Sequence, residues 1–194
     1  MPMRLCRHLS LSTIRRDVIG INQKVPIYNG QRVCYINLDN AASTPTLRPV
    51  LERVLDFLPW YSGVHRGSGY KSLISTTTYD AARVRIAQFF GADSNYHVVI
   101  FGKNTTEAIN LLADRLQFEP DDIVLTTEME HHSNDLPWRR VAKVIRAEVH
   151  QNGSLDEQDL ERKLTLYHRR IRLVAISGAS NVTGWVNDIP KIAS

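Results

Sequence analysis

The sequence predicts an α/β fold with a mostly parallel sheet. From residue 35 onward, short apolar runs of strand length alternate with segments of helical period, and polar loops separate them. The length of 194 residues fits one domain. We therefore expect an N-terminal segment, residues 1–34, followed by an α/β region, residues 35–194.

The first half of this region is predicted to hold two strands and two helices. Val50, Val54 and Leu58 fall on one helical face, which predicts the first helix. A proline and three glycines in twelve positions predict a conformationally permissive loop after it. The elements are, in order, a strand at 35–38, a helix at 47–58, a loop at 59–70, a helix at 73–90 that ends at Gly91, and a strand at 98–101.

The second half repeats the alternation of strand and helix. Its apolar runs are flanked by loops rich in small and polar residues, and an Asn-Gly pair predicts a tight turn. The elements are, in order, a helix at 105–116, a strand at 123–127, a loop at 128–134, a helix at 136–144, a strand at 145–149, a turn at 152–153, a helix at 156–167, a strand at 173–177 and a loop at 178–188.

Composition argues against several classes of function. The net charge is only +4 and the basic residues are scattered, so a nucleic-acid partner is not favoured. The densest basic cluster, 168–172, follows a predicted helix, where cations complement the helix dipole. Cys6 and Cys34 have neither the spacing of a metal site nor the density of a disulfide scaffold.

The sequence also bears on location. No apolar run approaches the roughly 18 residues that span a bilayer, so we expect no membrane segment. Residues 1–16 are rich in arginine and serine and contain no acidic residue, which resembles a mitochondrial presequence as much as an ordinary bacterial N-terminus. We favour a cytoplasmic location and keep mitochondrial targeting as the alternative.

In open α/β sheets, ligands bind beyond the carboxyl ends of the strands. The loop after 98–101 leads into a helix at Thr105 and Thr106, whose free N–H groups and hydroxyls favour an anion. Helix capping by Asn104 or Thr105 explains the same residues equally well.

Two further loops at this edge carry polar residues. The loop 128–138 holds adjacent His131 and His132, which lack metal-ligand spacing, so we predict no metal site and favour an imidazole that stacks on a planar cofactor. Surface-exposed histidines, with Asn134 as a helix cap, are the alternative. The loop 177–184 places Asn181 among small residues, which allows close approach to a ligand, although a simple turn remains open.

Five segments in register resemble the class V aminotransferase family, closest to the branch of cysteine desulfurases and selenocysteine lyases. They are LDNAAST at 38–44, VHRG at 64–67, NTTEAIN at 104–110, EHHSN at 130–134 and SNVTG at 180–184. The resemblance implies the N-terminal part of the large domain of a fold type I transferase dependent on pyridoxal 5′-phosphate. Residues 35–194 would be that partial cofactor-binding domain.

The resemblance implies cofactor contacts for four residues. Thr105 and Thr106 would hold the cofactor phosphate. His131 would stack on the pyridine ring and could act in acid/base chemistry, and we expect it, rather than His132, to face the cavity. Asn181 would lie beside the ring hydroxyl or the substrate.

Four other residues are implied at the substrate end of such a site. Ala41 and Ala42 would leave room for an amino acid. His65 and Arg66 would belong to a loop at the mouth of the site, near the partner of a homodimer.

The implied activity is removal of sulfur or selenium from cysteine or selenocysteine, with a protein as a possible sulfur acceptor. Transamination or epimerisation of an amino acid, or an inert fragment that acts at most as an interaction module, are the alternatives. In relatives the lysine that binds the cofactor lies downstream of the position of Ser194, and Lys103 does not match it. We therefore expect the chain alone to be inactive.

Overall fold

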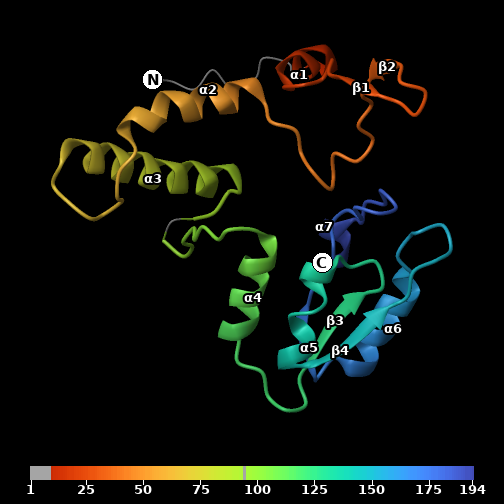
Figure 1. The fold of residues 1–194 in the computed structure, drawn as a ribbon. Helices are drawn as coiled ribbons and strands as arrows, with labels where there is room; N and C mark the ends of the chain where they lie inside the picture. The colour runs from red at the N-terminus through yellow and green to blue at the C-terminus, as the bar shows by residue number, and fades with distance from the viewer. Residues whose placement is uncertain (1–9, 94) are drawn as a thin grey trace. The chain divides into compact units, whose positions relative to one another are not determined.

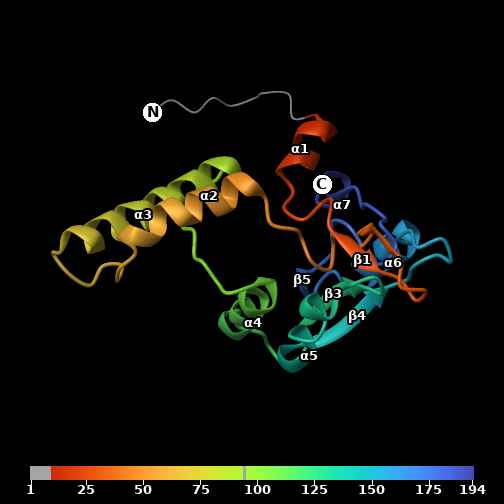
Figure 2. The ribbon, with the colours of Figure 1, turned by 45° about the horizontal axis from the view of Figure 1, so that its top comes forward.

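The computed structural model describes residues 10–93 and 95–194. The chain divides into two compact units, Met1–Val99 and Ile100–Ser194, and their α-helices and strands are labelled in Figures 1 and 2. Of the possible presequence, residues 1–9 lie outside the described part, and Leu11–Asp17 forms helix α1. No helix of the described residues is long and apolar enough to cross a membrane.

The second unit is built on a three-stranded parallel sheet with the strand order β4-β3-β5. β3 spans Ile123–Thr127, β4 spans Lys143–Ala147 and β5 spans Ile171–Val174. β3 pairs in parallel with both neighbours, and all five of its residues are buried. An apolar run that is buried on both faces is typical of a parallel sheet, so the predicted fold class is confirmed for this unit.

Helices cover both faces of this sheet (Figures 1 and 2). Successive strand residues point to opposite faces. Val124 accordingly packs in one cluster with Trp138 and Ala113, while Leu125 packs in the other with Leu160. The helices of this unit are α4 (Thr105–Arg115), η2 (His132–Asn134), α5 (Trp138–Val141), α6 (Glu157–Tyr167) and α7 (Ile189–Ile192).

The described residues of the first unit form no comparable core. Its elements after α1 are β1 (Lys24–Pro26) and β2 (Arg32–Cys34), which form an antiparallel hairpin, then α2 (Arg48–Phe57), η1 (Leu58–Trp60) and α3 (Tyr70–Phe89). α2 contains no buried residue, and the buried residues of α3 are Ser72 and Ser75. Among the contacts of this unit are side-chain hydrogen bonds from Ser72 and Ser75.

Those hydrogen bonds order the glycine-rich loop between η1 and α3. Ser75 Oγ accepts from the backbone N–H of Ser62 at 2.9 Å and donates to the carbonyl of Trp60 at 3.1 Å. Ser72 Oγ donates to the carbonyl of Gly63 at 2.7 Å. The loop predicted to be permissive is thus fastened to the first turns of α3.

Two predicted strands are wrong. Neither 35–38 nor 98–101 forms a strand, and Val98 and Ile100 are more than 70% exposed. A strand exists only when a neighbouring segment accepts and donates its backbone hydrogen bonds. Within the described residues neither run joins a sheet, although the N–H of Tyr35 donates to the carbonyl of Gln23 at 2.9 Å.

The boundary between α5 and β4 is also corrected. A helix was expected at 136–144 and a strand at 145–149, but the helix ends at Val141 and the strand begins at Lys143. Ala142 is extended, with φ −151° and ψ 169°. Parallel pairing of β4 with all of β3 outweighs the weak helical preference of Val144, a β-branched residue.

Candidate functional site

The second unit places its candidate site around the start of α4. Thr105 and Thr106 are the first two residues of α4 and both are exposed. Asn104 is the N-cap, and its Oδ1 accepts from the N–H of Glu107 at 2.9 Å. The capping alternative therefore holds for Asn104 rather than Thr105. The other N–H groups of the first turn remain suited to an anion.

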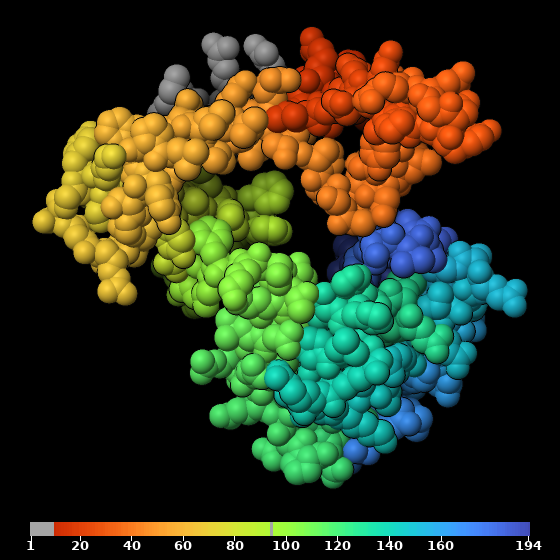
Figure 3. Space-filling model, viewed as in Figure 1, coloured from red at the N-terminus to blue at the C-terminus, as the bar shows by residue number. Residues whose placement is uncertain are grey.

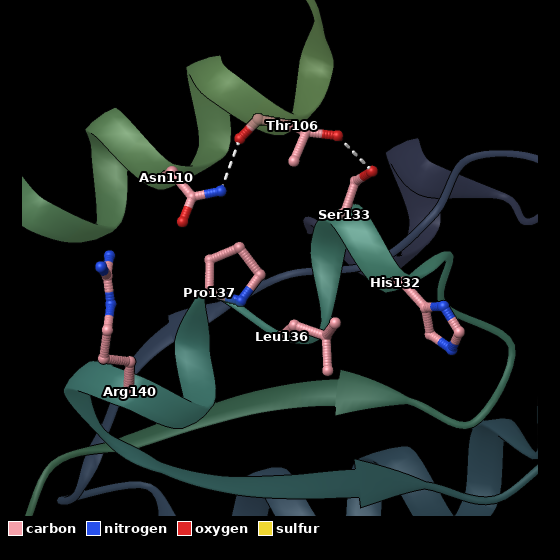
Figure 4. A pocket seen from close by; sticks show the side chains of 7 residues that line it. All are labelled: Thr106, Asn110, His132, Ser133, Leu136, Pro137 and Arg140. Carbon is pink, nitrogen blue, oxygen red and sulfur yellow. Dashed lines mark hydrogen bonds between the residues drawn. The ribbon is translucent and has the colours of Figure 1, made fainter.

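Thr106 contacts the loop after β3. Its Oγ1 lies 2.7 Å from Ser133 Oγ, 27 residues further along the chain. Ser133 Oγ also lies 2.9 Å from Nδ1 of His131. One serine hydroxyl thus joins the predicted phosphate-binding threonine to the predicted stacking histidine, and the first of these contacts is drawn in Figure 4.

A cavity of about 420 Å³ opens between α4 and the η2–α5 segment (Figure 4). His132 belongs to its lining and His131 does not, although we expected His131 to face the cavity of Thr106; the role of His131 toward a cofactor stays a prediction. His131 reaches Thr106 through Ser133 instead. The lining residues are Thr106, Asn110, His132, Ser133, Leu136, Pro137 and Arg140.

Glu130 joins the loop after β3 to the loop after β5. Its Oε1 accepts from Thr127 Oγ1 at 2.7 Å and from the N–H of Ser177 at 2.9 Å. Its Oε2 accepts from Ser177 Oγ and from Asn134 Nδ2, both at 2.7 Å. Because β3 and β5 are neighbouring strands, the carboxylate of Glu130 can bond to the loop after β3 and to the loop after β5 at the same time.

The loop after β5 carries Asn181. Ser180 is buried, and its Oγ accepts from the N–H groups of Val182 and Thr183, both at 3.2 Å. Asn187, also buried, donates through Nδ2 to the carbonyl of Ser177 at 2.8 Å. Asn181 is exposed at the tip of this closed loop and does not line the cavity beside Thr106.

The other four predicted residues belong to the first unit. Ala41 and Ala42 lie in an exposed turn, where the N–H of Ala42 donates to Asp39 Oδ1 at 3.2 Å. His65 has a positive φ of 54°, and its Nε2 lies 3.5 Å from Asp80. Arg66 is exposed. Their roles toward a substrate stay predictions.

A buried carboxylate with two arginine partners directly follows the loop of His131 and Ser133. Asp135 follows η2 and forms ion pairs with Arg139 and, at 2.6 Å, with Arg146 of β4. Burial acts to raise the pKa of Asp135, but hydrogen bonds from Arg139 and Arg146 outweigh it and hold this pKa below the ordinary value. Among residues 10–93 and 95–194, no group of acidic, histidine and cysteine side chains could hold a metal ion.

Sequence reasoning did not single out Ser133 or Glu130. Both lie in the EHHSN segment at 130–134, so the sequence shows which residues they are and which loop they belong to. Their partners were not, because Thr106 and Ser177 are 27 and 47 residues away in sequence.

Comparison with known proteins identifies the family. The Aminotransferase class-V profile matches residues 36–194. The chain belongs to the class-V aminotransferase family. A probable cysteine desulfurase from Synechocystis sp. is 38% identical over 189 residues, and a cysteine desulfurase from Dickeya dadantii is 37% identical over 194 residues. The apo structure of a cysteine desulfurase from Thermococcus onnurineus superposes with a TM-score of 0.78 at 31% identity.

These class-V relatives are much longer than the chain. The matches cover 94%, 95% and 94% of this chain but 43%, 45% and 43% of the three relatives, respectively. The α/β architecture with its parallel sheet thus corresponds to an N-terminal part of the class-V fold. Enzymes of this family depend in general on pyridoxal 5′-phosphate.

Proposed function

We propose that this chain supplies the phosphate-binding and ring-facing half of a pyridoxal 5′-phosphate site in a cysteine desulfurase or selenocysteine lyase-like enzyme. The observation that carries the proposal is the contact of Thr106, at the first turn of α4, with Ser133 and through it with His131. It occurs in a chain that is 38% identical to a probable cysteine desulfurase.

The residues of the second unit fit this cofactor chemically. The first turn of α4 offers backbone N–H groups and the exposed hydroxyls of Thr105 and Thr106, which suit a phosphate. His131 is exposed beside them and offers a flat ring. Asn181, on the loop that Glu130 ties to the His131 loop, offers an amide for a ring hydroxyl.

When bound, pyridoxal phosphate acts as an electron sink for bonds at the amino acid α-carbon. In our proposal Thr105 and Thr106 hold its phosphate, and His131 orients its ring. Glu130 and Ser133 hold the start of α4, the loop after β3 and the loop after β5 in fixed positions relative to one another. Ala41 and Ala42 line the substrate end, and His65 and Arg66 lie at the mouth of the site.

The wider assignments belong to the same proposal. We propose cysteine or selenocysteine as the substrate, a homodimer as the assembly, a protein as the possible sulfur acceptor, and the cytoplasm as the location. The names of the Synechocystis and Dickeya relatives favour the desulfurase over the transaminase or epimerase alternative.

The test is a titration of the 194-residue chain with pyridoxal 5′-phosphate, in which the change in cofactor absorbance gives the dissociation constant. We expect Thr106→Val to weaken binding about 10- to 100-fold, because a hydrogen bond to a charged group contributes about 1.5–3 kcal/mol. Thr165→Val is the matched control, since Thr165 is an exposed threonine on α6. Equal affinities for Thr106→Val and Thr165→Val would contradict the proposed phosphate site.

A fusion of this chain to the remaining sequence of the Synechocystis relative tests the reaction itself. We expect the fusion to convert cysteine to alanine and, with an added thiol as the reductant of the transferred sulfur, to release sulfide. The His131→Ala variant of the fusion should bind the cofactor less tightly by about 0.5–1.5 kcal/mol, the contribution of ring stacking. A fusion that binds the cofactor and exchanges amino groups, but releases no sulfide, would favour the transaminase.

A further inference from the structure

His131 is the N-cap of η2 through its side chain. The backbone N–H of Ser133 donates to Nδ1 of His131 at 3.1 Å. A ring nitrogen that accepts a hydrogen bond carries no proton. In the neutral imidazole the proton of His131 therefore resides on Nε2, and the capping of η2 sets this tautomer.

The hydroxyl of Ser133 has two partners but only one proton. Its Oγ lies 2.9 Å from Nδ1 of His131 and 2.7 Å from Oγ1 of Thr106. Since Nδ1 has no proton, Ser133 must donate in the contact with His131. Thr106 must then donate to Ser133, so the hydrogen bonds run from Thr106 through Ser133 to His131.

This direction changes when Thr106 donates elsewhere. If the hydroxyl of Thr106 turns to an anion at the start of α4, its oxygen becomes the acceptor for Ser133. The proton of Ser133 then leaves His131, whose Nδ1 keeps only the backbone N–H of Ser133. A serine hydroxyl rotates freely enough to make this exchange without backbone movement.

We propose that Ser133 is a positioning residue whose hydroxyl couples the hydrogen bonding of Thr106 to the imidazole of His131. The coupling is a property of this chain without ligand. Its further consequence, that phosphate bound at Thr106 is sensed at His131, rests on the proposed function.

The ligand-free test is a double-mutant cycle read by NMR on the 194-residue chain with ¹⁵N-labelled histidine. At about pH 8.5, where a neutral imidazole is observed, we expect an unprotonated Nδ1 and a protonated Nε2 in His131. Thr106→Val removes the hydrogen bond that polarises the Ser133 hydroxyl, so it should shift the Nδ1 signal in the wild-type background and leave it unchanged in Ser133→Ala. His131→Gln assigns the signal.

Two variants serve as controls. Ser133→Thr retains the hydroxyl and should restore the response to Thr106→Val. Thr105→Val makes the same change one residue earlier, at a side chain without a hydrogen bond in the described part of the chain, and should not shift His131. A protonated Nδ1, or the same response to Thr106→Val with and without the Ser133 hydroxyl, would overturn the proposal.

Addition of inorganic phosphate separates the two proposals. Binding should shift the backbone amides of Thr105 and Thr106, and the Nδ1 signal of His131 should follow in the wild type but not in Ser133→Ala. Amides that do not respond to phosphate, together with a positive double-mutant cycle, would contradict the phosphate site and leave the coupling intact. Amides that respond while Nδ1 of His131 stays constant would overturn the coupling alone.

Discussion

Asp159 of α6 is a buried carboxylate surrounded by donors. It forms ion pairs with Arg162 and, at 2.7 Å, with Lys163, and it accepts from the N–H of Glu148 at 2.9 Å. Burial acts to raise its pKa, but hydrogen bonds from Lys163, Glu148 and Arg162 lower it from 3.8 to about 2. The folded state therefore binds this proton less readily than the unfolded chain does.

Because the pKa of Asp159 is lower in the folded state, its contribution to stability is present above about pH 4 and is lost as the pH falls toward 2. We expect Asp159→Asn to remove about 1–2 kcal/mol from the free energy of unfolding at pH 6, after allowance for the solvent exposure of Arg162. The measurement is urea unfolding from pH 6 to pH 2.5. The exposed Asp121, paired with Arg170, supplies the control Asp121→Asn.

Between these pH values, the difference in stability between wild type and Asp159→Asn should shrink, while Asp121→Asn should parallel the wild type. A difference that stays constant down to about pH 2.5 would mean that the ion pairs of Asp159 do not lower its pKa in the folded chain.

At the scale of elements, Glu130 fastens β3 to the loop after β5. Glu130→Ala leaves four donor groups, on Thr127, Asn134 and Ser177, without their acceptor. We expect a loss of about 2–4 kcal/mol in the free energy of unfolding, since partly buried unpaired donors are costly. Hydrogen exchange at the Ser177 amide should also accelerate.

Glu128→Ala is the matched control for this loop, because Glu128 is an exposed glutamate two residues earlier. It should change stability by no more than about 0.5 kcal/mol. If Ser177 exchanges equally slowly in both variants, the carboxylate of Glu130 does not hold the loops together.

At the scale of the whole molecule, we expect the isolated chain to hold no covalent pyridoxal group. In our interpretation of the sequence, Lys103 does not match the lysine that binds the cofactor in this family, and it is paired with Glu107 at 3.2 Å. Borohydride reduction in the presence of the cofactor, followed by mass analysis, tests this. A stoichiometric pyridoxyl label on any lysine would contradict the expectation.

The first unit should make the chain self-associate. α2 exposes an apolar face, and each large apolar side chain that is covered gains about 1.5–3 kcal/mol. We expect sedimentation of the wild-type chain to show oligomers. The double variant Val54→Glu, Leu55→Glu should form fewer oligomers and should bind less of a dye that reports exposed apolar surface. A monomer that binds little dye would contradict this. The exposed apolar residues of α2 and η1 are Val50, Leu51, Val54, Leu55, Leu58 and Trp60.

The buried apolar side chains of the described residues all lie in the second unit, which runs from green to blue in Figure 3. There the sequence by itself determined the parallel α/β pattern, the bounds of β3, the start of α4 at Thr105 and the turn at Gly153, where φ is +86°. These features depend on local periodicity, capping and turn preferences, which a sequence displays directly.

Only the tertiary structure decided which apolar runs became strands and which loop residues met. The runs at 35–38 and 98–101 join no sheet within the described residues, although their composition suits a strand. Ser133 and Glu130 acquired their partners across 27 and 47 residues. Strand pairing and side-chain contacts depend on distant segments that come together only on folding, and no local pattern encodes the position of the partner.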